Sequence, residues 1–497
     1  MVEALWLGLD VGTSAVKALV ADSAGRVIAH GSAALTTSSP HPGWSEQNPD
    51  DWWLALAVAA AEARKVAGAR WDDIAGIGLS GQMHGAVLLD EARVVLAPVM
   101  LWNDTRAEPE SASLNLAIPD IVEVAGVAAL PGFTAPKLLW LAQHQPELHA
   151  RIRHILMPKD WIGMRLHGRL LSDPSDAAGT HLFDQGARDW HLGLCSAARV
   201  DPAWLPVVQP GDAVAGSLLG DGAKALGLRE GLPVATGAGD TAAGAVGAGV
   251  VRPGRVVLSL GTSGQIFLAT DAHVPRTEGH VHAYAHTLEN VWFRMAAMLN
   301  GARPLAWYAA TTGQSVPAML DAAAQADLDR VPLFLPYLTG ERTPHGNSAI
   351  RASFLGLADD TGAPEMARAV VEGIAYSFAD GANALGGLSG LSPLVTGGGA
   401  QSDMLMQTLC DVLAVPIRRP AGAALGPAAG AARLASVAAG SVAPARLADE
   451  PPVAREFVPD ATAAARHQTR LRVFRDLYRV IAPLGAIGDV RASGGDV

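Results

Sequence analysis

Cysteine is nearly absent from this sequence of 497 residues, which contains only Cys195 and Cys410. Their surroundings indicate neither a disulfide framework nor a CxxC metal site. Long apolar runs are also missing, since none approaches the roughly 20 residues that a membrane span needs. The N-terminus, MVEALWLGLD, has no basic leader and is typical of a β-strand. These absences predict a cytoplasmic protein with reduced thiols and no membrane partner.

Basic residues are outnumbered, with 37 Lys and Arg against 48 Asp and Glu and a net charge of −11. Such a chain is repelled by a phosphate backbone, so nucleic acid is not an expected partner. No lysine follows a glycine as in a P-loop, and no GxSxG motif occurs, which excludes a Walker-type ATPase and the commonest hydrolases. A chain that is 49% hydrophobic and 17% charged is typical of a globular enzyme, and its length favours two domains.

One pattern occurs twice along the chain. Residues 5–9 form an apolar run, the turn DVGTS follows at 10–14, and residues 15–20 form a second apolar run. Residues 255–260, the turn GTSG at 261–264 and residues 265–269 repeat this order. Each copy predicts a β-hairpin, and the repeat predicts two duplicated α/β domains. We expect an N-terminal domain at 1–246, a C-terminal domain at 247–485 and a frayed tail at 486–497.

Both repeated turns have the chemistry of a phosphate site. A carboxylate such as Asp10 beside Gly, Thr and Ser can hold Mg²⁺, while backbone N–H groups face a phosphate. Two such turns could clamp one triphosphate from both sides. The alternative is two ordinary hairpins in which glycine and hydroxyl groups only satisfy the turn.

A further glycine-rich segment, GAGDTAAG at 237–244, contains Asp240 after a short apolar run. It resembles the dinucleotide fingerprint GxGxxA, but the acidic residue expected about 20 positions later is missing, which argues against a dehydrogenase. Asp240 at the mouth of this turn is a candidate general base toward a substrate hydroxyl. It is equally consistent with a helix N-cap.

Two loops after apolar strands carry side chains suited to a polyhydroxyl substrate. The first is SGQMHG and the second is LWNDTR. Amide, imidazole, carboxylate and guanidinium groups can bind several hydroxyls, while a methionine or tryptophan packs against an apolar face of the sugar. The alternative for the second loop is a surface turn with a local salt bridge. The candidate substrate residues are Gln82, Met83, His84, Trp102, Asn103, Asp104 and Arg106.

Three histidines in HVHAYAH, at positions 280, 282 and 286, have the even spacing of one strand face. A zinc site is one interpretation, but no carboxylate or cysteine accompanies them at a defined spacing, so we favour a hydrogen-bonded polar face. The segment GERTPHGN, with Glu341 and Arg342, follows another apolar run and is interpreted as a loop at the cleft.

With these motifs assembled, the chain resembles the FGGY carbohydrate kinases from about residue 5 to residue 483. The specific segments are DVGTSAVK, HPGWSEQNPDDWW, GQMHG, LWNDTR, PGFTAPKLLW, SDAAGT, SLGTSG, FLPYLTGERTPH and TGGGAQSD, in family order. The resemblance implies two ribonuclease H-like, actin-type domains with a cleft between them. Glycerol kinases carry a different sequence in place of GQMHG, so the implied activity is ATP-dependent phosphorylation of D-xylulose to D-xylulose 5-phosphate.

The resemblance also assigns roles. Asp240 becomes the catalytic base, and Asp10 serves the γ-phosphate and Mg²⁺. Thr241 is a departure, because many relatives have asparagine there, and fine substrate positioning depends on it. A homodimer is common among relatives, although the sequence carries no interface signature. The implied ATP-binding residues are Gly12, Thr13, Ser14, Lys17, Gly261, Thr262, Ser263, Gly397, Gly398, Gly399, Ser402 and Asp403.

Two alternatives stay open from the sequence. Within the same enzyme class, the substrate could be ribulose, fuculose, xylitol or arabitol, since one side-chain rotation in the cleft can change the preference. From another class, an actin-like ATPase shares the hairpins but lacks the GQMHG and LWNDTR loops, and it hydrolyses ATP without any sugar.

Overall fold

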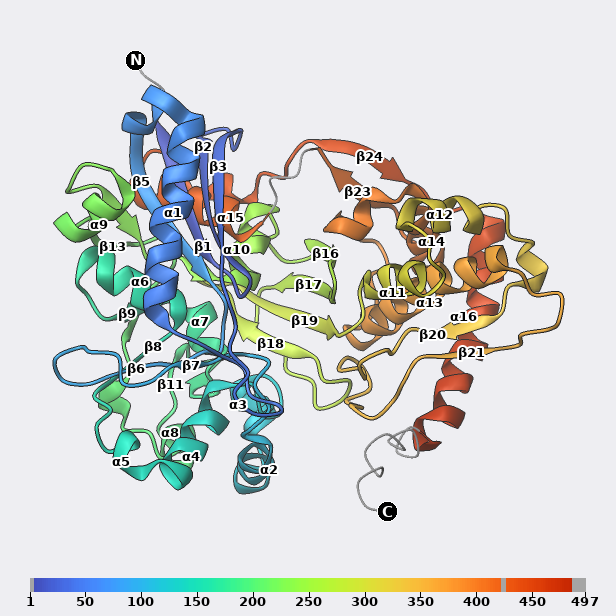
Figure 1. Cartoon of the computed structure of the whole chain (residues 1–497), viewed down its shortest axis with the longest axis horizontal. Helices are drawn as coiled ribbons and strands as arrows, with labels where there is room; N and C mark the ends of the chain where they lie inside the picture. Colours follow the sequence, from blue (N-terminus) through green and yellow to red (C-terminus); the bar gives the residue numbers. More distant parts are fainter. Residues whose placement is uncertain (1–3, 422–425, 485–497) are drawn as a thin grey trace.

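The computed structural model describes residues 4–421 and 426–484 of the chain. They form two lobes, each built on a seven-stranded sheet, which lie side by side (Figure 1). The predicted tail at 486–497 lies outside the described residues. The two lobes agree with the predicted duplication of α/β domains, and the boundaries at 246 and 485 stay a prediction.

The N-terminal lobe contains the first hairpin. Strand β1 pairs antiparallel with β2 and parallel with β5, and β2 continues to β3. The sheet order is β13-β14-β5-β1-β2-β3, with β15 also paired to β5. The strands are β1 (Leu5–Val11), β2 (Ala15–Asp22), β3 (Val27–Ala34), β5 (Ile74–Gly81), β13 (Val214–Ser217), β14 (Pro233–Ala235) and β15 (Ala238–Gly239).

Helices cover this sheet on both faces. Helix α1 (Pro49–Ala67) packs on β2 and β3, where its alanines approach the strands closely. It begins at a capping Asn48 followed by proline and ends at Gly68, which has a positive φ. Helices α6 (Pro158–His167), α9 (Gly220–Leu226) and α10 (Asp240–Gly247) complete the lobe.

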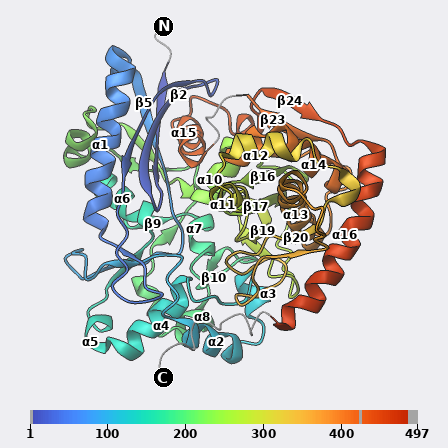
Figure 2. The ribbon, with the colours of Figure 1, turned by 45° about the vertical axis from the view of Figure 1, so that its right-hand side comes forward.

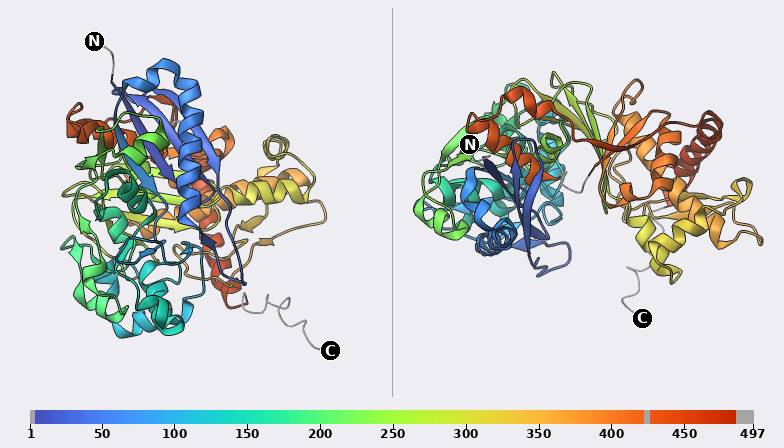
Figure 3. Two further views of the ribbon diagram at one scale, coloured as in Figure 1. Left: turned by 60° about the vertical axis from the view of Figure 1, so that its left-hand side comes forward. Right: turned by 90° about the horizontal axis from the view of Figure 1, so that it is seen from above.

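One helix from late in the sequence also belongs to this lobe. Helix α15 (Pro427–Ala438) packs against β1, β5 and α10, as Figures 1 and 3 show. A Cβ atom added at Gly430 would lie 1.8 Å from the carbonyl oxygen of Ala243, and one added at Gly8 would lie 1.8 Å from that of Ala428. Glycine is therefore required at these contacts. After most of the C-terminal lobe, the chain therefore returns to the N-terminal lobe at α15. The predicted C-terminal domain at 247–485 had included this helix.

A smaller layer extends below the first sheet (Figure 2). It consists of short helices and two-stranded pairs that hold the loops at the ends of the strands. The helices are α2 (Glu108–Ala117), α3 (Ile121–Ala125), α4 (Thr134–His144), α5 (Pro146–His149), α7 (Pro174–Ala178) and α8 (Leu192–Ala197). The strand pairs are β4 (Glu46–Gln47) with β7 (Val99–Met100), β6 (Val87–Leu89) with β8 (His154–Leu156), β9 (Leu171–Ser172) with β12 (Val207–Val208), and β10 (Phe183–Asp184) with β11 (Asp189–Trp190).

The C-terminal lobe repeats the arrangement of the first sheet. Strand β16 pairs antiparallel with β17 and parallel with β22, as β1 does with β2 and β5. The order is β18-β19-β17-β16-β22-β23-β24. The strands are β16 (Val256–Leu260), β17 (Gly264–Thr270), β18 (His282–Ala285), β19 (Trp292–Met298), β22 (Leu394–Thr396), β23 (Ile417–Pro420) and β24 (Val453–Phe457). The predicted second hairpin is thus confirmed.

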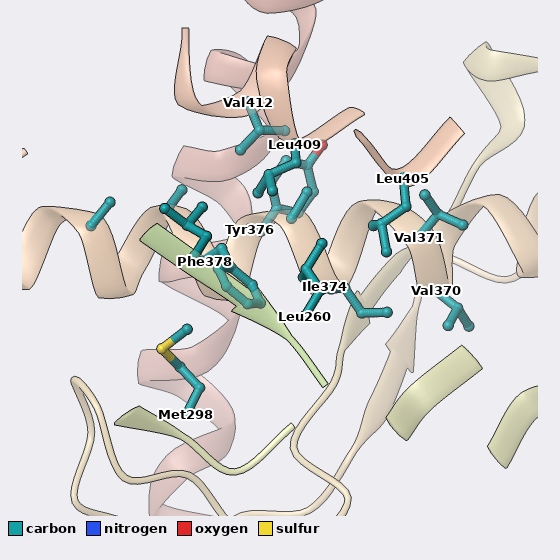
Figure 4. Close-up of a cluster of buried hydrophobic side chains, with 14 of the residues drawn as sticks. Leu260, Met298, Val370, Val371, Ile374, Tyr376, Phe378, Leu405, Leu409 and Val412 are labelled. Carbon is teal, nitrogen blue, oxygen red and sulfur yellow. The ribbon is translucent and has the colours of Figure 1, made fainter. Parts of the chain in front are cut away.

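The core of this lobe forms between its sheet and the long helix α13 (Ala363–Ala384). Figure 4 shows Ile374 and Phe378 of α13 packed against Leu260 and Met298 from the strands, with Leu409 of α14 on the other side. These side chains are fully buried, which stabilises the lobe by hydrophobic transfer. The remaining elements are α11 (Arg303–Thr311), α12 (Val316–Ala323), α14 (Asp403–Leu413), α16 (Ala461–Ile481), β20 (Leu333–Leu335) and β21 (Ser353–Leu355).

Candidate active site

A cavity of about 280 Å³ lies between the two lobes. It brings together six of the residues predicted from sequence, four from strand-end loops of the N-terminal lobe, one from the start of α10 and one from the second hairpin turn. The wall on the C-terminal lobe is largely apolar and comes from β17, β18 and β19. The predicted residues in the lining are Thr13, Met83, His84, Trp102, Asp240 and Ser263.

Asp240 is the first residue of α10 and follows directly after β15. Gly237, whose φ is 84°, lies directly before β15. Burial raises the pKa of Asp240 from 3.8 to about 6, and a hydrogen bond from the Thr241 hydroxyl to Oδ1, 3.2 Å long, acts in the opposite direction. The residue that departs from the family pattern therefore contacts the predicted base. A carboxylate with a pKa near 6 can accept a proton at neutral pH.

Asp10 lies at the end of β1 and is 4% exposed. Burial, followed by the negative charge of Asp240, raises the pKa of Asp10 to about 7, although Lys17 on the paired strand acts in the opposite direction. The Oδ1 atom of Asp10 has no hydrogen-bond partner among the described residues. A buried carboxylate oxygen without a partner, next to a second carboxylate, is suited to bind a cation.

His84 reaches the cavity from a strained turn with a φ of 71°. Its Nδ1 lies 2.6 Å from the carbonyl oxygen of Gly179, and its ring packs on Phe133 at 4.5 Å between centroids. Burial lowers the pKa of His84 to about 3, so the imidazole is neutral at physiological pH. A neutral ring that donates from Nδ1 leaves Nε2 as an acceptor for a substrate hydroxyl.

The rest of the two predicted sugar loops lies outside the cavity lining. Gln82 is buried and accepts a 2.8 Å hydrogen bond from the Thr13 hydroxyl, which also accepts from the Trp102 indole at 3.0 Å. These contacts tie the GQMHG loop, the LWNDTR loop and the first hairpin together. Asn103 is exposed.

Asp104 and Arg106 form an ion pair of 2.6 Å, as the alternative interpretation expected, but the pair is buried rather than on the surface. Asp104 also accepts from the Ser45 backbone N–H at 2.7 Å, and the Arg106 guanidinium lies 3.4 Å from the ring centre of Trp44. The pair fixes the loop that carries Trp102.

A second cavity of about 200 Å³ shares Asp240, Thr241 and Gln265 with the first. It extends along the C-terminal lobe to Thr396, the last residue of β22. Asp240 therefore lies where the two cavities meet. The predicted glycines of the nucleotide side begin at the next residue, so this second cavity leads toward them.

The predicted nucleotide-side residues surround the second hairpin. Gly397 has a φ of 93°, and a Cβ there would lie 2.7 Å from the carbonyl oxygen of Leu260, so the glycine turn lies against the GTSG turn. Gly398 and Gly399 continue in a 3₁₀ turn, and the Ser402 hydroxyl caps α14. Of the other predicted residues, Gly12 and Ser14 lie in the first turn, and Lys17 is exposed on β2. The carbonyl oxygens of Gly261 and Thr262 accept backbone hydrogen bonds from residues 302 and 301. Asp403 forms ion pairs with Arg419 and Arg455.

Sequence reasoning missed several cavity residues. Gln265, Tyr284, Phe293 and Met295 line the wall from the C-terminal lobe, and they come from the three strands β17, β18 and β19. Arg342 also lines the cavity, which agrees with the interpretation of GERTPHGN as a cleft loop.

The three histidines of HVHAYAH do not share one strand. Strand β18 begins only at His282, because His280 occupies a turn with a φ of 49°. His282 and His286 are buried, and burial lowers the pKa of both. No group of three or more histidine, cysteine or acidic side chains within 4–421 and 426–484 is arranged to hold a metal ion.

A buried charge cluster behind Asp240 was also missed. The Lys159 ammonium, fully buried, pairs with Asp160, with Asp173 at 2.9 Å and with Asp176 at 3.3 Å. Asp173 accepts from the Ser175 hydroxyl at 2.5 Å, and that hydroxyl accepts from the Gly239 N–H at 3.0 Å. The cluster therefore fixes the residue that precedes Asp240. Two members of the cluster, Ser175 and Asp176, belong to the segment SDAAGT, which is one of the segments that carry the family pattern in the sequence.

Comparison with known proteins gives the family. The N-terminal domain pattern of the FGGY family of carbohydrate kinases matches residues 5–247, and its C-terminal domain pattern matches residues 256–439. The chain belongs to the FGGY family of carbohydrate kinases. As a member of that family, the chain is a sugar kinase, and its cavity lies between the two matched domains.

Its relatives in the family cover almost the whole chain. It is 41% identical to the xylulose kinase of Escherichia coli K12 and 39% identical to that of Klebsiella pneumoniae, over 97% of this chain and 100% of each relative. Among solved structures, a xyloylose kinase from Brucella ovis is 39% identical with a TM-score of 0.92, over 97% of this chain and 100% of that one. A gluconate kinase from Lactobacillus acidophilus is 26% identical with a TM-score of 0.90, over 97% and 98%.

As in the sequence, the described helices of this kinase show no candidate membrane span, since none is both long and apolar enough to cross a bilayer.

Proposed function

We propose that this carbohydrate kinase transfers the γ-phosphoryl group of MgATP to the C5 hydroxyl of D-xylulose. The relatives of 41% and 39% identity, named xylulose kinases, support this substrate. The observation that carries the proposal is the place of Asp240, a carboxylate with a pKa raised to about 6, at the junction of two cavities. The sugar occupies the larger cavity and the phosphates approach from the smaller one.

The reaction needs one proton acceptor. The C5 oxygen attacks the γ-phosphorus while its proton passes to the Asp240 carboxylate. The bond between the γ-phosphorus and the bridging oxygen breaks, and ADP leaves. Positioning and charge stabilisation supply most of the rate enhancement. The general base adds typically about 10²- to 10⁴-fold.

Three side chains of the N-terminal lobe orient the sugar. Nε2 of His84 accepts a hydrogen bond from a sugar hydroxyl, since its Nδ1 is engaged with Gly179. Met83 packs on the carbon skeleton, and Trp102, held by Thr13, closes the cavity from the side. Their arrangement holds the C5 hydroxyl toward Asp240.

The phosphates are bound by the two hairpin turns, which contain Gly12 and Thr13 in one lobe and Gly261 and Thr262 in the other. Gly397–Gly399 and the start of α14 receive the adenosine. Asp10 fits a Mg²⁺ ion, because its Oδ1 is buried without a partner and Mg²⁺ is often held by one carboxylate, phosphate oxygens and water. The bound ion would neutralise charge on the phosphate oxygens.

A coupled ADP-release assay tests the proposal. The purified enzyme with MgATP is given D-xylulose, D- and L-ribulose, L-fuculose, glycerol, xylitol and arabitol in turn. The highest specificity constant is expected for D-xylulose. A higher specificity constant for another sugar would change the assigned substrate, but the protein would still be a sugar kinase. ADP release that is the same with and without every sugar would instead indicate an ATPase without sugar chemistry.

A further inference from the structure

The C-terminal lobe contributes an arginine side chain, Arg342, to one end of the larger cavity. Arg342 lines this cavity, yet its guanidinium makes no hydrogen bond or ion pair with the residues in 4–421 and 426–484. The Tyr284 side chain beside it is 1% exposed, and its hydroxyl likewise has no partner in those ranges. A buried hydroxyl without a partner costs free energy, so Tyr284 points to a ligand that supplies the partner, and the half-buried guanidinium of Arg342 offers further donors to that ligand.

Arg342 is held firmly by its own backbone. Its N–H donates to Oε1 of Glu341 at 2.8 Å, and the same oxygen accepts from the Leu299 N–H at 2.6 Å. The following residue, Thr343, donates its hydroxyl to the carbonyl of His280 at 3.0 Å. These bonds join the loop to the end of β19 and to the turn before β18. The guanidinium is therefore carried by a fixed loop, which favours selective binding.

Arg342 lies at the end of the cavity away from the base. Its positive charge is among the causes that lower the pKa of His84 and of His282, after burial. Arg342 lines only the larger cavity, whereas Asp240 lies where this cavity meets the smaller one. A substrate whose reacting hydroxyl meets Asp240 therefore extends its other end toward Arg342 and Tyr284.

The chemistry of a ketopentose defines what that other end is. This step rests on the proposed function. Ring closure of a 2-ketopentose consumes the C5 oxygen, so a molecule with a free C5 hydroxyl is open-chain and carries a carbonyl at C2. A carbonyl oxygen only accepts hydrogen bonds, whereas a hydroxyl in the same place also carries a proton that needs an acceptor. A guanidinium offers five donors and no acceptor.

We propose that Arg342, together with the Tyr284 hydroxyl, binds the C2 carbonyl of the open-chain ketose and selects ketoses over alditols. The carbonyl receives charge-assisted hydrogen bonds from the guanidinium. An alditol in the same place leaves the proton of its C2 hydroxyl facing a cation. Binding also captures the open-chain form, which is the form with a free C5 hydroxyl.

The test compares D-xylulose with D-arabitol, one of the two alditols formed by its reduction at C2, in the wild type and in Arg342→Gln. Glutamine has both a hydrogen-bond donor and an acceptor, so the side chain stays polar but no longer prefers a C2 carbonyl over a C2 hydroxyl. We expect the Kd of D-xylulose, measured by calorimetry, to rise about 10- to 100-fold, as loss of a hydrogen bond to a charged group predicts. The Kd of D-arabitol should change less than about threefold. Arg342→Lys should restore part of the preference.

The matched control is Arg472→Gln, which removes an exposed arginine of α16 in the same lobe. It should leave both dissociation constants unchanged. Equal losses for the two ligands in Arg342→Gln, or a rise in the KM of MgATP with unchanged sugar binding, would overturn the proposal. If the wild type prefers another ketose, the D-xylulose assignment fails, and the same comparison is made with that ketose and its alditol.

Discussion

Replacing Asp240, the predicted base, by asparagine is expected to stabilise the protein while it lowers turnover. Asp240 is largely enclosed, and burial raises its pKa from 3.8 to about 6. The native state therefore holds the proton more tightly than the unfolded chain does. An acid with a raised native pKa destabilises the fold above that pKa, and the penalty disappears below the unfolded pKa.

The size of the effect follows from the pKa difference. The step from 3.8 to about 6 corresponds to about 3 kcal/mol at neutral pH, counting about 1.36 kcal/mol for each pH unit. Asp240→Asn keeps the acceptor for the Thr241 hydroxyl and removes the charge. We therefore expect a gain of about 2 to 3 kcal/mol at pH 7.5. For a lobe of roughly 240 residues, the unfolding entropy converts this gain into a Tm increase of about 4 to 6 °C.

The assay is thermal unfolding of the wild type and Asp240→Asn at several pH values between 5 and 8. The difference in Tm should be constant above pH 7 and should shrink as the pH falls through 6. Asp359→Asn, which changes an exposed loop carboxylate, is the control and should show no such difference. The proposed effect of burial on the pKa of Asp240 would be refuted if Asp240→Asn were no more stable than the wild type at pH 7.5. It would also be refuted if the difference in Tm did not change with pH. Turnover should fall about 10²- to 10⁴-fold in the same variant.

Three further predictions concern the sugar loop, the pH profile and the packing of α15. His84→Ala should raise the KM for the sugar far more than the KM for MgATP, because His84 lines only the larger cavity, and equal changes would contradict its role. The value of kcat/KM should fall about tenfold per pH unit below about 6, since only the Asp240 carboxylate accepts a proton, and a midpoint near 4 in the pH–rate profile would argue against this base. Gly430→Ala should destabilise the protein by about 3 kcal/mol or more, because the new Cβ would lie 1.8 Å from the Ala243 carbonyl oxygen. Gly244→Ala, whose Cβ would meet nothing within 4 Å, should be neutral or slightly stabilising in the same chemical denaturation experiment.

Local features of the chain were predictable from sequence. The two hairpins follow from short apolar runs on either side of a Gly-Thr-Ser turn, and helix α1 follows from the Asn48–Pro49 start and the Gly68 end. These features depend on neighbouring residues, whose turn and cap chemistry can be recognised without knowing the fold. The resemblance also led to Asp240, Met83 and His84, which the structure brings into one cavity.

Other features depended on contacts between residues far apart in the chain. Asp104 and Arg106 have the residue types of a sugar site, but they are buried in an ion pair because Ser45, Glu46 and Trp44 close over them. Helix α15 joins the first sheet although it follows most of the second, because Gly8, Gly78 and Gly430 allow backbones to touch.

The sequence by itself determined the family and the duplicated hairpins and indicated Asp240 as the candidate base, because each depends on short contiguous motifs. The tertiary structure decided which side chains of the C-terminal lobe share a cavity with Asp240. Tyr284 lies in β18 and Arg342 in a loop 58 positions later; the sequence indicated that loop as part of the cleft but gave no signal that Tyr284 shares its cavity. Folding of the C-terminal lobe brings Tyr284 and Arg342 together, and docking of the two lobes places them in one cavity with Asp240, whose pKa is raised by burial.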